Sequence, residues 1–394
     1  MTSSKTNYDY DLIIIGSGIA GSGLACALAK HKLRILLLEK RRRLGTIHRG
    51  DSLVPKNTAL LAQWGLFDAL MEAGAVPIDQ VEFHHQDRML FHTKLTDGES
   101  SPYLVLPHAK TELLLQAQAM ATGNVTLAQP ATLKGLLRDT EDGPVRGIAY
   151  KDDTGDHEVT APLTVGADGQ QSALRNMLGI PFESYYYDHA YFGLEAERPA
   201  SYQDAMRIQL HADGGVLLMP RPDRVGVGVL VEAGSASYWM GLSDDELSTI
   251  LVERVPSLKG MKLFRDGSHV YTITRTHAPR YVTDGAVIIG DAAHTTNPTA
   301  GQGMALALSD AGSLAAHVGP LLEAGEEINT ILKSYEQSQW NANQRLVRTS
   351  HWLSLLYGAR GTVRHGMKMT VLKVLSNSLG SRIAKPVIEN FMQA

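Results

Sequence analysis

The sequence predicts an α/β fold, in which an open and mostly parallel sheet carries an inserted, mostly antiparallel β-sheet and is followed by a helical tail. Four short apolar runs, at 12–15, 35–38, 163–165 and 287–289, are each followed at once by glycine or glutamate. Such runs are typical of parallel strands that are buried on both faces. Between about 181 and 275 the residues tend to alternate, and turn sequences separate the runs, which indicates antiparallel strands.

The first forty residues contain the most informative pattern. The run at 12–15 leads into Gly16-Ser17-Gly18-Ile19-Ala20-Gly21, a helical pattern follows, and the run at 35–38 ends at Glu39. Here Gly16 permits a tight turn, Gly18 lets a pyrophosphate approach the backbone, and Gly21 lets the helix lie close to the sheet. The helix start offers free N–H groups, and an acid about 20 residues on can bond a ribose hydroxyl. The pattern predicts a Rossmann-like dinucleotide-binding domain rather than a glycine-rich turn that binds nothing.

A short basic run, Lys40 to Arg43, follows this acid. We interpret it as a solvated loop, and the alternative is a place for the 2′-phosphate of a nicotinamide cofactor.

Composition limits the classes of function. A net charge of −4 over 394 residues argues against a nucleic-acid groove as the main function. The single cysteine, Cys26, falls among small apolar residues of the first helix, so we expect a core residue and neither a disulfide scaffold nor a thiolate metal site. The N-terminus lacks a signal-peptide core, and no apolar run approaches the ~20 residues of a spanning helix. We expect a soluble, cytoplasmic protein without a metal ion.

The chain divides into three predicted parts. A discontinuous nucleotide-binding domain is expected at 9–75, 107–180 and 276–345, a substrate-binding domain at 76–106 and 181–275, and C-terminal helices at 346–394. The last part is basic. We interpret it as helices packed on the protein with a solvated basic side, and peripheral membrane contact or a partner-binding face is the alternative. The sequence leaves the oligomeric state open.

Two further strand ends carry polar motifs. The run at 163–165 leads into Gly166-Ala167-Asp168-Gly169, with Ser172 and Arg175 on the helix that follows. The run at 287–289 leads into Gly290-Asp291-Ala292-Ala293-His294, and Pro298 and Gly301-Gln302-Gly303-Met304 come next, before a helix of small residues. Because ligands gather at the carboxyl ends of parallel strands, we expect the three stretches to meet at one site.

These three stretches, in this order, resemble the class A FAD-dependent monooxygenases, the para-hydroxybenzoate hydroxylase-like family, from about residue 9 to 350. The resemblance implies that the protein binds FAD and uses NADPH or NADH and O₂ as co-substrates. It implies the hydroxylation of an aromatic or other electron-rich small molecule by way of a flavin C4a-hydroperoxide. A phenol, a quinolone and a polyketide ring suit the sequence about equally.

The resemblance also implies roles for individual residues. The first motif would hold the ADP half of FAD, Asp291 would bond the ribityl chain, and the helix start at 301–304 would lie near the flavin pyrimidine ring. Arg49 resembles the arginine that contacts FAD and gates flavin movement, and Asp168 and Arg175 resemble a motif that serves both cofactors. The expected cofactor contacts are Gly16, Gly18, Ile19, Ala20, Gly21, Glu39, Lys40, Arg49, Lys110, Asp168, Asp291, Gly301, Gln302, Gly303 and Met304.

At the reaction centre the resemblance places Pro298 and Arg49, while His211 and the Tyr185–Tyr187 cluster are pocket candidates chosen from the residues themselves. The chain departs from the family pattern at Ala305 and Leu306, where a polar residue is common, and at Lys110, where Gln or Arg is common. An FAD-dependent reductase of isoprenoid-type double bonds and a non-catalytic FAD-binding module are the alternative functions. The stretch 290–303 disfavours an NAD-dependent dehydrogenase without flavin.

Overall fold

The computed structural model describes residues 7–45, 50–95, 101–298, 301–358, 361, 365–366 and 369–370 of the chain. Within these residues, six strands form a sheet in the order β18-β19-β12-β1-β2-β8, and all pairs are parallel except β18 with β19. The strands are β1 (Leu12–Ile15), β2 (Ile35–Leu38), β8 (Val125–Ala128), β12 (Thr164–Gly166), β18 (Val282–Thr283) and β19 (Ala286–Ile288).

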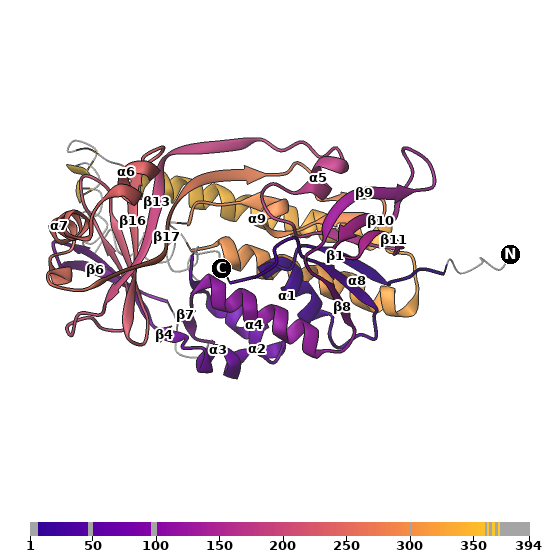
Figure 1. Ribbon diagram of the computed structural model, residues 1–394, viewed down its shortest axis with the longest axis horizontal. Helices are drawn as coiled ribbons and strands as arrows, with labels where there is room; N and C mark the ends of the chain where they lie inside the picture. Colours follow the sequence, from indigo (N-terminus) through magenta and orange to yellow (C-terminus); the bar gives the residue numbers. More distant parts are fainter. Residues whose placement is uncertain are drawn as a thin grey trace.

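The predicted apolar runs form the centre of this sheet. Every residue of β1 and β2 is buried, and Leu12, Ile13 and Ile14 are fully enclosed. Burying one such side chain stabilises the fold by roughly 1.5–3 kcal/mol, so both faces of the sheet must be covered. Helix α1 (Ile19–Ala27) packs between α4 (His108–Ala121) and α8 (Gly303–Ala324) on one face. A sheet of β9 (Thr132–Arg138), β10 (Val145–Asp152) and β11 (Gly155–Thr160) lies on the other (Figure 1).

The second large sheet has eight strands among the described residues, in the order β20-β17-β13-β16-β15-β14-β5-β6. All neighbours are antiparallel except β14 with β5. The strands are β5 (Gln80–His85), β6 (Arg88–Lys94), β13 (Ser184–Glu197), β14 (Met206–Gln209), β15 (Val216–Pro220), β16 (Arg224–Glu232), β17 (Leu263–His277) and β20 (His294–Thr295).

One face of this sheet packs on helices α6 (Ala236–Gly241) and α7 (Asp244–Arg254). Phe192, Val227 and Val229 alternate toward Trp239 of α6 and Leu247 of α7 in a separate core cluster. Ser243 caps α7: its side chain accepts from Glu246 N, and the Glu246 carboxylate accepts from Ser243 N in return. The opposite face of the sheet is turned toward the parallel-sheet part (Figure 1).

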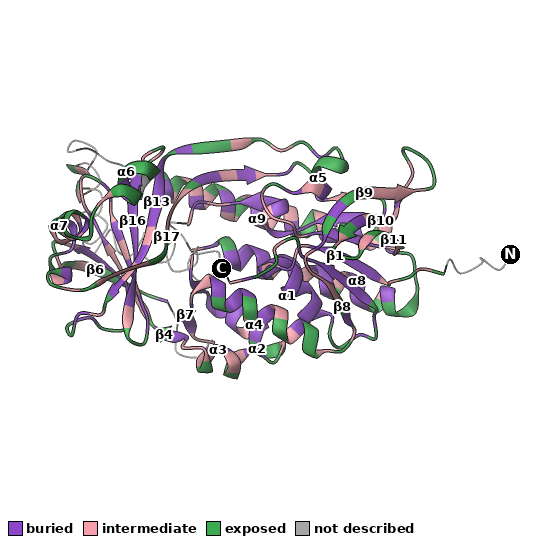
Figure 2. Ribbon diagram, viewed as in Figure 1, coloured by how far each residue is buried: buried purple, intermediate pink, exposed green. Residues whose placement is uncertain are grey.

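Short elements and the tail connect the two parts. β3 (Ser52–Leu53), β7 (Tyr103–Val105) and β4 (Val76–Ile78) form a small sheet, and α2 (Pro55–Gln63) and α3 (Phe67–Glu72) lie beside α8 and α4. α5 (Ala173–Met177) follows β12, and α9 (Asn329–Tyr357) packs along α8. Figure 2 shows the strands of both large sheets mostly buried and exposed residues on the outer sides of α4 and α6. The architecture confirms the predicted α/β fold, its inserted antiparallel sheet and a helical C-terminal region. The domain boundaries themselves stay a prediction.

Candidate functional site

The carboxyl ends of four adjacent strands form one edge of the parallel sheet. Gly16 follows β1, Glu39 follows β2, Asp168 comes two residues after β12, and Gly290 comes two residues after β19. Backbone hydrogen bonds fix these loops to one another: Gly16 N donates to Leu38 O at 2.8 Å and Ile289 N donates to Gly166 O at 2.9 Å. The structure therefore brings the three predicted stretches together at the edge where α/β sheets bind ligands.

The glycines of the first motif differ in what requires them. Gly16 has φ +100°, and a Cβ on Gly21 would lie 1.9 Å from Gly16 O, so the chain's own backbone and packing require both. Gly18 has ordinary extended backbone, with φ −79° and ψ −165°. A Cβ on Gly18 would come no closer to the protein than 3.8 Å, to Glu112 Oε1. Among the described residues nothing demands glycine at 18, and its missing side chain leaves room for a ligand to approach the backbone.

Beside this turn, Glu39 forms part of a buried charge cluster. Its carboxylate accepts from Ser17 N at 3.1 Å and forms an ion pair with Arg41 at 3.0 Å. Arg41 also pairs with Glu112, another buried carboxylate, at 2.7 Å. Burial alone would lower the pKa of Arg41, but the hydrogen bonds and charges of both carboxylates raise it. Two carboxylates around one guanidinium leave net negative charge and acceptor oxygens beside the start of α1, which suits a ribose hydroxyl.

Asp168 and Arg175 hold the second stretch in shape. The Asp168 carboxylate accepts from the Ser172 hydroxyl and from Ala173 N, the latter at 2.7 Å, so it caps the short helix α5. Arg175 is buried and donates to Gln170 O and to Ala292 O, both at 2.9 Å, and thereby ties the second stretch to the third. Burial lowers the pKa of Arg175, and Asp168 opposes that shift.

The start of α8 is also built from glycine. Gly301 has φ +66°, and Gln302 is fully buried at the N-cap without a side-chain capping bond. Gly303 opens the helix, and a Cβ there would have no described atom within 4 Å. Met304 is buried in the main core. The first backbone N–H groups of this 22-residue helix have no acceptor within the helix itself, and they carry the positive end of its dipole.

Behind the third stretch lies a buried polar network. Asp310 of α8 is fully buried and accepts from Gly290 N at 2.8 Å, from His294 Nε2 at 2.7 Å and from Asn343 Nδ2 at 2.9 Å. Burial would raise the pKa of Asp310, but the charge of His294 and the three donors lower it. Asn343 belongs to α9. The network thus fixes the Gly290–Asp291 turn to two long helices.

Pro298 lies at the junction of the two parts. Its carbonyl accepts from Gly301 N at 2.9 Å, which turns the chain toward α8. The preceding residue, Asn297, is fully buried, with Nδ2 3.1 Å from His189 Nε2 on β13 and its carbonyl accepting from Ser350 Oγ on α9 at 3.1 Å. The structure therefore places Pro298 between the nucleotide edge and the antiparallel sheet.

Four predicted residues have surroundings that do not identify them with the candidate site: one is exposed beside Glu39, two have partners in other parts of the fold, and one lies outside the described residues. Lys40 is exposed, and Lys110 donates to Ala73 O at 2.7 Å at the end of α3. His211 lies in the turn after β14, where burial and then the charge of Arg254 lower its pKa, and its charged neighbours belong to the antiparallel part. Arg49 lies outside the described residues.

The aromatic cluster is only partly a pocket candidate. Tyr186 is 67% exposed and Tyr185 is 44% exposed, so both face solvent. Tyr187 is buried, and its hydroxyl lies 2.8 Å from His351 Nδ1 of α9.

Sequence reasoning missed Arg41, Glu112, Asp310 and Asn343. A signal existed for Asp310, because it falls on the apolar stripe of a small-residue helix, between Leu308 and Ala311 and in step with Leu314. Arg41 was hidden inside a basic run that resembles a solvated loop. Glu112 and Asn343 gave no signal, since their partners are distant in sequence.

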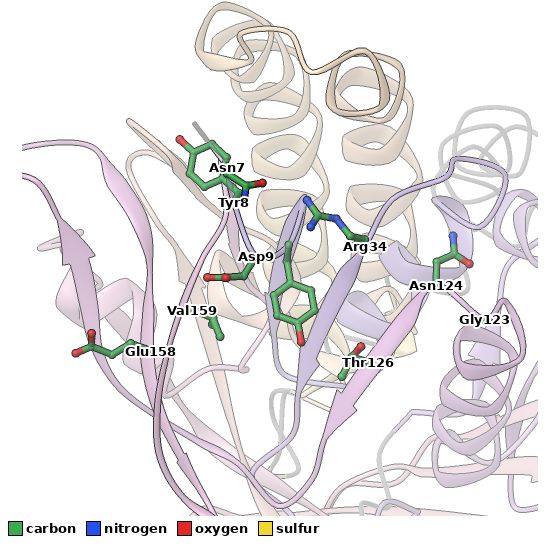
Figure 3. A pocket seen from close by; sticks show the side chains of 10 residues that line it. Asn7, Tyr8, Asp9, Arg34, Gly123, Asn124, Thr126, Glu158 and Val159 are labelled. Atoms are coloured by element: carbon green, nitrogen blue, oxygen red, sulfur yellow. The ribbon is translucent and has the colours of Figure 1, made fainter. Parts of the chain in front are cut away.

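A polar pocket lies at the opposite edge of the parallel sheet (Figure 3). Its lining includes Asp9, Arg34 and Asn124, which precede β1, β2 and β8, so it is separated from the strand ends described above by the length of the sheet. Among the described residues, no cluster of His, Cys, Asp or Glu is arranged to hold a metal ion. No helix in that part of the chain has the length and apolar character needed to cross a membrane.

Comparison with known proteins agrees with this geometry. The chain is 28% identical over 323 residues to 6-methylpretetramide 4-monooxygenase of Streptomyces rimosus, covering 78% of this chain and 74% of that protein. It is 26% identical over 319 residues to 3-demethoxyubiquinol 3-hydroxylase of Escherichia coli K12, covering 78% and 79%. The crystal structure of PqsL, described as a probable FAD-dependent monooxygenase from Pseudomonas aeruginosa, superposes with a TM-score of 0.78 at 22% identity, over 92% of this chain and 99% of that one. A further PqsL structure contains 2-aminobenzoylacetate.

The FAD binding domain family matches residues 9–350, which include every described loop of the candidate site. The chain therefore belongs to this family, as an FAD-dependent monooxygenase of the aromatic hydroxylase type.

Proposed function

We propose that the protein binds FAD at the edge described above and uses NADPH or NADH and O₂ to hydroxylate an aromatic or other electron-rich small molecule. The curated relatives support the reaction class, since two of them are named as a monooxygenase and a hydroxylase of ring compounds. The PqsL complex supports an aromatic substrate, because that protein binds an aromatic amine.

One observation carries the cofactor assignment. Gly18 and Gly303 stand at the starts of α1 and α8, have room for a side chain, and lack the positive φ that would require glycine. Glycine in the same two places is explained if a ligand approaches both helix starts. A dinucleotide with a flavin at one end has the length and the charge for this: phosphate at the first helix and an electron-poor ring at the second.

The residues present fit such a group. Gly18 and the N–H groups of α1 would receive the pyrophosphate, Glu39 and Arg41 the ribose, Asp291 the ribityl chain, and the N–H groups at 302–304 the flavin ring. When bound, FAD supplies the redox and oxygen-transfer chemistry, while the chain supplies binding, orientation and electrostatics. The α8 dipole favours negative charge on a ring held at its start, and the buried sheet–helix interface keeps bulk water away from it.

Flavin content and redox behaviour test this proposal. The purified protein should show the visible absorption bands of a flavin, release FAD on denaturation, and be bleached by NADPH or NADH without oxygen. Steady oxygen uptake should then yield an oxygenated product from an aromatic panel. A rate unchanged by removing oxygen would favour the reductase, and bound flavin that neither nicotinamide reduces would favour the non-catalytic module. Colourless protein that stays colourless after incubation with FAD would refute the cofactor assignment.

The substitution Gly18→Ala gives a sharper test. The added Cβ has 3.8 Å of clearance, so the fold should persist, but it would stand where the pyrophosphate approaches. FAD affinity should fall by about tenfold or more while circular dichroism and thermal stability stay unchanged. The matched control is Gly241→Ala at the end of α6, where a Cβ would meet no described atom within 4 Å and FAD affinity should be unchanged.

A further inference from the structure

A row of paired residues crosses the antiparallel sheet on the face turned away from α6 and α7. Gly228 pairs with Leu217 on one side and with Gly193 on the other, and Gly193 pairs with His269 on the next strand. Directly paired residues share a face, and Phe192 and Val229, their chain neighbours, point to the α6 and α7 side. We call the set the glycine row: Phe91, Phe83, Ile208, Leu217, Gly228, Gly193 and His269.

The end of the row at Phe83 is covered. Phe83 stacks on Phe91 with ring centroids 4.4 Å apart and is 3% exposed. It belongs to a core cluster with Val54, Tyr103 and Ala305, the last of which lies in the first turn of α8. The face of the row therefore adjoins the start of α8, where the flavin ring is proposed to lie.

The middle of the row is open. Gly193 and Leu217 are both partly exposed, although they lie in central strands of a sheet between two layers. A Cβ on Gly193 would find no described atom within 4 Å. Tyr191 and Tyr271 stand beside this gap and stack with centroids 5.8 Å apart, and His269 stacks on Tyr271 at 5.3 Å. Leu217 and His269 are three strand spacings apart, about 14 Å, and the two positions between them are Gly228 and Gly193. A Cβ on Gly228 would lie 3.5 Å from the Tyr191 ring, so Tyr191 covers Gly228 and the gap lies over Gly193.

Charge beside the gap is already neutralised. A Cβ on Gly226 would lie 2.8 Å from the Arg221 guanidinium, so this cation lies over the same face of β16, two residues from Gly228. Arg221 is buried and pairs with Asp51, and it lies 3.6 Å from Glu195. Within the glycine row, His269 is the one ionisable side chain. A carboxylate placed over the glycines would thus meet a cation that is already shared by two acids.

We propose that the glycine row is the floor of the substrate site and that it selects a flat, uncharged ring system of about two fused rings over its carboxylated analogue. This rests on the proposed function, which places the flavin ring at the start of α8, beside this face. Gly193 is the specificity-determining position, since its missing side chain leaves the space, and Gly228 beside it lets the Tyr191 ring lie close to β16. The tyrosine pair beside them offers an aromatic wall, and aromatic rings favour offset or edge contacts with a planar ligand.

Equilibrium binding to the flavin-loaded protein tests the proposal without relying on turnover. 2-Naphthol and 6-hydroxy-2-naphthoate are the probes, and isothermal titration calorimetry gives their dissociation constants. We expect 2-naphthol to bind about tenfold more tightly or better, because the added carboxylate is desolvated and the described cation beside it, Arg221, is already paired with acids. Gly193→Val should raise the dissociation constant of 2-naphthol by about tenfold or more, because valine suits a strand and its side chain fills the open gap.

Gly135→Val is the matched control. Gly135 lies on a strand of the separate β9–β11 sheet, is partly exposed, and has no atom closer than 4.0 Å to an added Cβ. The Gly135→Val variant should bind 2-naphthol with the affinity of the wild-type protein. Equal binding of the two probes, equal affinity in Gly193→Val and wild type, or no 2-naphthol binding at all would overturn the proposal. Flavin spectra and anaerobic reduction of the same preparations test the proposed function separately, so a failure of the proposed function can be distinguished from a failure of the glycine-row proposal.

Discussion

The buried Asp310 offers the most informative test of how the nucleotide edge is held. Asp310→Asn keeps the shape of the side chain but removes its charge. In the unaltered protein one carboxylate oxygen of Asp310 accepts from both Gly290 N and His294 Nε2, and the other accepts from Asn343 Nδ2. An asparagine can serve the first pair with its oxygen, and its own NH₂ then faces the NH₂ of Asn343. The substitution therefore removes a buried carboxylate charge that three donors stabilise, and it sets two donors against each other.

The magnitude follows from these contacts. A hydrogen bond to a charged group contributes about 1.5–3 kcal/mol, and a buried donor left without an acceptor costs about 1–3 kcal/mol. The terms overlap, so we expect a loss of about 3–5 kcal/mol, against a total stability of about 5–15 kcal/mol for a typical protein. Because Gly290 N is one of the donors, FAD affinity should fall as well.

Urea denaturation followed by circular dichroism measures the free energy of unfolding. The swap Asp310→Asn with Asn343→Asp moves the carboxylate to α9, where it can accept from the amide introduced on α8 and from His294, and it should recover at least about 1 kcal/mol of the loss. Asp213→Asn is the control, since its side chain is 71% exposed and the change should stay within about 0.5 kcal/mol. A loss below about 1 kcal/mol in Asp310→Asn, or a swap as unstable as the sum of its parts, would refute the reasoning.

Three further outcomes are expected. Burial, and then the charge of His294, lowers the pKa of His277 from 6.5 to about 4, so between these values the unfolded chain binds a proton that the native state excludes. The free energy of unfolding should fall by roughly 2 kcal/mol as the pH drops through this window, a value reduced to allow for the partial exposure of His277. In His277→Phe the midpoint of urea denaturation should depend less steeply on pH, and an unchanged slope would contradict the assignment. Arg221→Met leaves the buried carboxylate of Asp51 without its cation and should lower the free energy of unfolding, measured by chemical denaturation, by about 3–5 kcal/mol. Adding Asp51→Asn should restore part of this loss, and a loss near zero in Arg221→Met would show that the pair is dispensable. Burial raises the pKa of the Cys26 thiol to about 12, so a thiol-specific chromogenic disulfide should label it only after denaturation, and rapid labelling of native protein would disprove its burial.

Local pattern was enough for the first motif and for most of the strands. β1 and β2 lie where their apolar runs predicted them, and β12 and β19 are displaced by only one residue. The agreement is close because short β-branched and leucine-rich runs flanked by glycine suit a parallel sheet in almost any context. The roles of Gly16 and Gly21 also followed from the motif, since a positive φ and a close backbone approach are conditions that the residue type itself reveals.

The roles of residues chosen singly stay predictions. Lys40 follows the acid of the first motif and is exposed, and Lys110, which falls where the resembled family often has Gln or Arg, donates to Ala73 O at a helix end. Arg41, one residue further, is the cation that pairs with Glu39 and Glu112. A side chain's direction depends on which neighbour can pair with it, and Glu112 comes from a helix 71 residues away.

The amino-acid sequence by itself determined the parallel sheet, the strand ends that meet at its edge, the helix starts made of glycine and the family. Each of these depends on local spacing and on residues a few positions apart, which physical rules of strands, turns and helix termini govern directly. Only the tertiary structure decided that Asp310 lies behind the third loop, that Arg221 is shared between two acids, and that Gly193 pairs with Gly228 beside an open gap. Those relations arise from pairing between strands and helices distant in sequence, because burial, charge and free space are set by neighbours that local pattern cannot specify.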